Sequence, residues 1–159
     1  MAEILKNIEN NLKMQIELFE KLIELEKAKQ QALVNNRIQV LEMVTAQEEK
    51  ILLDVSRLEE ERLYWADFFA QETGKKREDI TLRDLETVHP VFKDIRAQLE
   101  KEIREIQFLK ETNTKLLEHA IGLVNITINA LTSTSKATYS PNNKGYKWNK
   151  ENFFIDKDA

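Results

Sequence analysis

The chain has 159 residues, of which 3 are glycine, 2 are proline and none is cysteine. This length suits a single domain, and so little glycine and proline argues against a β-sandwich or barrel, which needs frequent turns. The absence of cysteine excludes disulfides, cysteine-ligated zinc, iron–sulfur clusters and a thiol nucleophile. A formal net charge of −4 makes the chain a poor general binder of nucleic acid or of an anionic membrane.

The first residues, MAEILKNIENNLKMQ, contain no apolar run long enough for a signal peptide or a membrane span. We therefore expect a cytoplasmic protein that does not insert into a membrane.

The first predicted helix covers about residues 3–34. Apolar residues from Leu5 to Ile23 recur at spacings of three and four, and glutamate and lysine occupy the other faces. Asn35 and Asn36 then interrupt the pattern. Because asparagine tolerates the left-handed conformation and also caps helices, this pair favours a break over a helix that runs straight through.

The second predicted helix covers about residues 37–72 and ends before Gly74, the residue type that commonly follows a helix end. Gln47 or Glu48 falls where its stripe should be apolar. The charged run at 59–62 is interpreted as a solvated face with helical charge pairing. Three aromatic residues near the end of this helix are interpreted as packing at the end of a bundle: Trp65, Phe68 and Phe69.

The connector that follows contains Thr81 with Asp84 three residues later, a weak form of the capping box. Pro90 suits the first turn of a third long helix, which we place at about 90–131. Asn113 interrupts the apolar stripe of that helix. This position is more consistent with a buried polar group that fixes helix register than with an edge position that faces water.

Three long amphipathic helices, none of them apolar all round, must bury their stripes against one another. We therefore predict an all-α fold, an elongated, coiled-coil-like antiparallel bundle of three long helices over residues 1–131. Residues 132–159 are rich in polar residues and are predicted to form a flexible C-terminal tail. The aromatic residues in it are typical of a segment that folds on binding: Tyr139, Tyr146, Trp148, Phe153 and Phe154.

The sequence contains no pattern for a catalytic, metal or cofactor site. Its isolated glycines cannot form a phosphate-binding loop. His89 and His119 lie on separate predicted elements without a carboxylate or histidine partner at metal-binding spacing, and the serines have no triad context. We expect a protein that is not an enzyme and that needs no cofactor.

Two segments resemble FlgN-like flagellar export chaperones. Residues 32–62, ALVNNRIQVLEMVTAQEEKILLDVSRLEEER, resemble the helix–turn–helix segment of that family, which leads into an LExER motif. Residues 113–144 resemble its last helix and tail. The discriminating piece is Asn113 followed by a leucine run and later by Thr-Tyr-x-Pro at 138–141. The sequence departs from the common pattern at Ser140, where glycine is frequent, and in a tail that continues well past that point.

This resemblance implies a cytoplasmic, substrate-specific chaperone of the flagellar type III export system. Such chaperones bind the C-terminal helical regions of hook-associated (hook–filament junction) proteins, keep them unpolymerised and deliver them to the export gate. In this family a tyrosine in the C-terminal part contributes to docking on the cytoplasmic domain of the gate. The motif match assigns that role to Tyr139, with Tyr146 as a nearby competitor.

Physical reasoning points to the same part of the chain, because a chaperone must cover the apolar stripe of a cargo helix with a stripe of its own. The residues predicted to bind cargo are Leu116, Leu117, Ala120, Val124, Leu131, Trp148, Phe153 and Phe154. We expect a monomer or a weak dimer. The length of the third stripe leaves an alternative open, a coiled-coil scaffold or adaptor that self-associates.

Overall fold

The computed structural model describes residues 1–132, and every regular element in that range is helical. The predicted all-α class is thus confirmed. The described part contains four α-helices: three long ones and a short one in the connector before the last long helix. In chain order the elements are α1 (Ala2–Val34), α2 (Ile38–Thr73), the 3-10 helix η1 (Arg77–Asp79), α3 (Leu82–Val88) and α4 (Val91–Thr132). Over the same residues, no helix has the length and apolarity that a membrane crossing requires.

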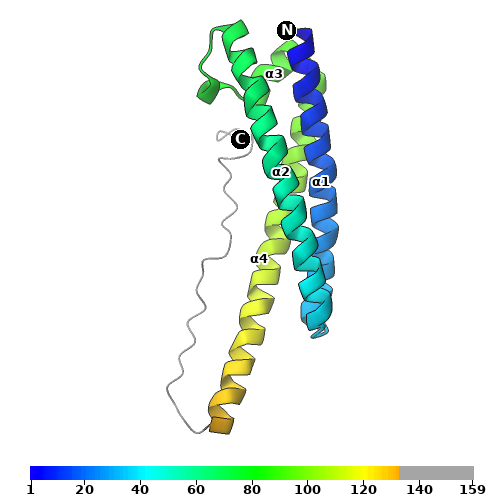
Figure 1. Cartoon of the computed structure of the whole chain (residues 1–159), viewed down its shortest axis with the longest axis vertical. Helices are drawn as coiled ribbons and strands as arrows, with labels where there is room; N and C mark the ends of the chain where they lie inside the picture. The colour runs from blue at the N-terminus through cyan, green and yellow to red at the C-terminus, as the bar shows by residue number, and fades with distance from the viewer. Residues whose placement is uncertain (133–159) are drawn as a thin grey trace.

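The three long helices lie lengthwise beside one another (Figure 1). α1 starts at the end of the molecule that holds α3, α2 returns along α1, and α4 runs again in the direction of α1 (Figure 1). α1 packs against both α2 and α4. It is therefore the helix through which the other two long helices are held together.

A tight turn joins α1 to α2. Asn36 has a φ of 53°, a left-handed conformation that asparagine adopts more readily than most residues. The amide of Asn35 donates to the carbonyl of Gln31 at 3.0 Å, and the amide of Arg37 donates to that of Ala32 at 2.9 Å. These bonds satisfy carbonyls at the end of α1 and reverse the chain, so that α1 and α2 form a hairpin.

The connector between α2 and α4 closes the other end of the bundle. Gly74 ends α2 with a φ of 70°, where a side chain would be strained. Thr81 and Asp84 form a complete capping box at the start of α3: each side chain bonds the backbone N–H of the other. The leucines that α3 buries, Leu82 and Leu85, have no exposed surface and join the core.

The apolar core is a single cluster that runs from α3 along α1 and α4. Its largest fully buried members are Phe19, Phe69 and Phe92. On α4 the buried apolar positions end at Leu109, and the next buried residue is Asn113, which is 4% exposed. None of the described side chains of α4 beyond Asn113 is buried. The core therefore holds only the first half of α4.

The interpretation of residues 59–62 as a solvated face is wrong for Arg62, which is only 3% exposed. Leu58, Arg62 and Ala66 follow one another at spacings of four, so Arg62 lies on the buried face of α2. Its guanidinium Nε donates to Glu59 at 3.1 Å. Arginine can occupy such a position because its aliphatic stem packs while its charge is paired.

The aromatic residues at the end of α2 divide between core and surface. Phe69 is 1% exposed and Trp65 packs against the core, so both contribute to packing at the end of the bundle. Phe68 is instead 37% exposed, and its ring lies 5.0 Å from that of Tyr64 in an edge-on arrangement.

Candidate functional site

The cargo-binding residues predicted on the last long helix lie on its C-terminal half. Leu117 is 44% exposed and Leu131 is 80% exposed, whereas Leu116 and Ala120 are half-buried. Val124 belongs to the same helix, and its side chain lies outside the described part. We call the apolar residues of α4 from Leu116 to Leu131 the distal surface.

The larger part of the distal surface is accessible because α4 extends past the hairpin (Figure 1). Asn113 of α4 contacts Glu26 of α1, which lies 87 positions earlier in the chain. Because the two helices run in the same direction, Val34, the last residue of α1, lies level with position 121. The remaining residues, 122–132, span roughly 16 Å at 1.5 Å per residue. Neither α1 nor α2 is long enough to cover them.

The distal surface contains more apolar residues than the single predicted stripe. Leu123 and Ile126 are 53% and 66% exposed, and neither was in the predicted set. The signal that could have identified them is the segment 120–131, AIGLVNITINAL, which has no charged residue. A helix without charge that is not buried in its own bundle is a strong indication of a protein-binding surface.

The other predicted site residues lie outside the described residues. They are the cargo-binding candidates Trp148, Phe153 and Phe154, and Tyr139, which was assigned to docking on the export gate.

A buried polar layer marks the point where α4 leaves the core. We define it by Glu26 of α1, Glu48 of α2 and Asn113 of α4, which are 1%, 5% and 4% exposed. The Asn113 amide donates to the main-chain carbonyl of Glu26 at 2.9 Å and to its carboxylate at 2.8 Å. The prediction that Asn113 is buried is confirmed, and its partner is a carboxylate that the sequence pattern did not single out.

Two lysines flank the polar layer. Lys29 donates to the Glu48 carboxylate and lies 3.5 Å from Glu26 Oε1. Lys110 lies 3.6 Å from the second oxygen of Glu48. Both lysines therefore form ion pairs with Glu48, whereas only Lys29 lies near Glu26. Glu26 Oε1 has no hydrogen-bond partner among the described residues.

This asymmetry separates the acidities of the two carboxyl groups. Burial and the nearby Glu48 carboxylate raise the pKa of Glu26 to about 7. Burial also acts to raise the pKa of Glu48, but the neighbouring Glu26 carboxyl group and the hydrogen bond from Lys29 outweigh it and lower that pKa. Glu26 is therefore the carboxyl group of the pair that holds a proton near neutral pH.

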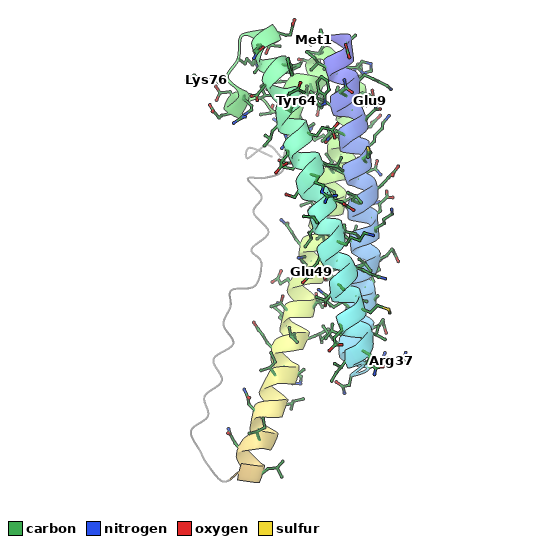
Figure 2. All side chains as sticks on the ribbon, viewed as in Figure 1. Met1, Glu9, Arg37, Glu49, Tyr64 and Lys76 are labelled. Carbon is green, nitrogen blue, oxygen red and sulfur yellow. The ribbon has the colours of Figure 1, made fainter. Side chains whose placement is uncertain are left out.

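A groove of about 600 Å³ opens next to the polar layer, between the hairpin and α4. Apolar residues from all three long helices line it: Leu33, Leu41, Leu52 and Leu117. Figure 2 shows α4 diverging from α2 near Glu49 and continuing past the hairpin turn at Arg37. The groove therefore leads directly onto the distal surface.

The region combines apolar surface with a buried polar layer. The described residues include no group of three histidine, cysteine, aspartate or glutamate side chains that could hold a metal ion. What the region offers is apolar surface beside a polar floor, the arrangement that accepts an amphipathic helix.

Glu26 makes the stability of the fold depend on pH. Its pKa is about 7 in the folded chain, against an ordinary value of 4.5, so the folded state binds the extra proton between these values. The stability that this proton contributes is complete below pH 4.5 and is lost as pH rises through 7. Glu26→Gln keeps the hydrogen bonds and removes the titration. The wild type should lose about 1–3 kcal/mol more than this variant between pH 5 and pH 8.

Urea unfolding at several pH values between these limits measures the difference. Glu49→Gln is the matched control, since Glu49 is an exposed acid one residue from Glu48, and it should retain the wild-type pH dependence. Equal losses in the wild type and in Glu26→Gln would contradict the assignment of the proton to Glu26.

Comparison with known proteins agrees with the predicted resemblance. The model of the FlgN protein family matches residues 1–145, which include all four α-helices. No curated protein and no solved structure matches the chain. Because the family match covers most of the sequence, the chain belongs to the FlgN family of flagellar export chaperones.

Proposed function

We propose that this FlgN-family chaperone binds hook-associated, hook–filament junction proteins, prevents their premature assembly and delivers them to the export gate. Membership of the family supports the general role in flagellar export. The observation that carries the choice of cargo surface is the exposed distal surface of α4, where Leu117 and Leu131 are 44% and 80% exposed.

The distal surface suits cargo of this kind for a physical reason. The terminal helices of a junction protein are amphipathic and self-assemble when their apolar stripes are exposed. A chaperone prevents this by covering that stripe with apolar surface of its own, at about 25 cal/mol per Å² buried. We take residues 1–131 as an elongated antiparallel bundle that presents this surface, and residues 132–159, of which 133–159 lie outside the described part, as a segment that binds partners.

The tail completes the proposal. We assign cargo contacts to Trp148, Phe153 and Phe154 and gate docking to Tyr139. Aromatic residues suit this role because each offers large contact area with few rotatable bonds. We place this action in the cytoplasm, and the family, one of chaperones, supports binding rather than catalysis.

The same exposed residues favour a second candidate function, self-association as a coiled-coil scaffold. Two copies could bury their distal surfaces against each other instead of against cargo. We expect the free chain to sediment mainly as a monomer at micromolar concentration and to form a one-to-one complex with cargo. A tight dimer that cargo does not dissociate would favour the scaffold.

Charged substitutions on the distal surface should weaken cargo binding without unfolding the bundle. In the double variant Leu117→Asp, Leu131→Asp we expect the affinity for the C-terminal region of a junction protein to fall about ten- to hundredfold. Each leucine that cargo buries contributes on the order of 1 kcal/mol or more. Isothermal titration calorimetry measures the affinity. Leu53→Asp is the control, because Leu53 is 55% exposed but lies on α2 away from this surface.

Tyr139→Ala separates the two proposed roles of the tail. We expect it to weaken binding to the purified cytoplasmic domain of the export gate severalfold and to leave cargo affinity nearly unchanged. Parallel pull-downs with gate domain and cargo make the comparison. An equal loss of both would rule out this division between Tyr139 and the other aromatic residues.

A further inference from the structure

The groove between the hairpin and α4 has two unlike walls. On the hairpin side are Leu33 of α1 and Leu41 of α2, both half-buried, and on the other side is Leu117 of α4. All three are leucines from different helices that face one volume without filling it. Each retains apolar surface that a further helix could cover.

The floor of the groove is polar and its balance of charge is negative. Four glutamates and two lysines line it. With Glu26 protonated near neutral pH, three carboxylates still face two lysines, and both lysines lie against Glu48. Of the glutamates, Glu49 and Glu111 are exposed at the rim. A partner that places positive charge beside its apolar stripe therefore fits the groove better than an acidic one.

The groove and the distal surface are continuous, because Leu117 belongs to both. At about 600 Å³ the groove lies within the range of about 300–1,000 Å³ that is usual for ligand-binding pockets. It is open rather than enclosed, because α4 diverges from the hairpin at this level (Figure 2). A helix lying along α4 would thus enter the groove with one of its ends.

We infer that the cargo helix docks between the hairpin and α4, so that Leu33 and Leu41 form a second wall of the binding site opposite Leu117. The inference rests on the proposed function, since it assigns to cargo both the groove and the distal surface. The occupant is an amphipathic helix with apolar residues at spacings of three and four and with lysine or arginine beside them. The hairpin is then part of the recognition site as well as support for α4.

Substitutions in the hairpin wall test this inference separately from the proposed function. We expect the double variant Leu33→Asp, Leu41→Asp to bind the C-terminal helical region of a junction protein about tenfold or more weakly than the wild type. If it binds normally while Leu117→Asp, Leu131→Asp does not, the second wall is refuted and the proposed function stands. If neither double variant loses affinity, the cargo surface itself is wrong.

A single cysteine provides a readout that does not depend on the stability of these variants, because the chain has no cysteine of its own. Thr45 lines the groove and Ser56 is exposed farther along α2. Cargo should slow the alkylation of Thr45→Cys severalfold and leave that of Ser56→Cys unchanged. Alkylation of both at the unliganded rate in a saturated complex would overturn the inference.

Charge reversal at the rim tests the predicted chemistry of the occupant. Glu49→Lys should weaken cargo binding severalfold, whereas Glu60→Lys, at an exposed position elsewhere on α2, should not. Raised salt should reduce the difference between wild type and Glu49→Lys, since exposed charges are screened. Tighter binding by Glu49→Lys would exclude a basic flank on the cargo helix.

Discussion

The contact between Asn113 and Glu26 determines where the bundle ends. The apolar core holds α4 against α1 as far as Leu109. One turn later, the hydrogen bond from the Asn113 amide to Glu26 connects the two helices. Because that amide bonds both the main chain and the side chain of Glu26, a shift of α4 along α1 would leave a buried polar group unsatisfied, at a cost of about 1–3 kcal/mol. The contact therefore fixes the axial position of α4 and, with it, how far α4 projects.

The difference in helix length then exposes the proposed binding surface. α1 has 33 residues and α4 has 42, and both begin at the end of the bundle that α3 closes. With the register fixed near Asn113, the excess length of α4 must extend beyond the hairpin. Most of the segment without charge, 120–131, lies in this extension. The end of α4 is thus an exposed apolar helix. It would stay uncovered even if α4 ran straight along the hairpin, because the hairpin is too short to reach it.

Sequence periodicity was sufficient for the class of fold, because amphipathic helices of this length carry a repeat that no other element produces. It was also sufficient for Asn113, whose interruption of an apolar stripe is a local signal. It did not identify the burial of Glu26, since that depends on Glu48 and on Asn113, which is 87 residues away. Arg62 was misplaced for a related reason, because a charged side chain was assumed to face water.

The groove could not be predicted from periodicity at all. It exists because of the angle at which α4 leaves the hairpin, and a stripe of apolar residues contains no information about that angle. The exposed positions of the distal surface were predictable only in part, since a stripe selects one face, whereas the segment 120–131 is apolar on several faces.

The amino-acid composition of the projecting segment, 120–131, favours reversible binding. Residues 120–131 contain isoleucine, valine, threonine, asparagine and Gly122, all weaker helix formers than alanine or leucine. A helix of about a dozen such residues is marginal in water without a packing partner. If this segment binds cargo as proposed, part of the free energy of binding must offset the ordering of the segment, which lowers the affinity without reducing the contact area. A large and specific contact of moderate affinity is what a chaperone needs if it must also release its cargo.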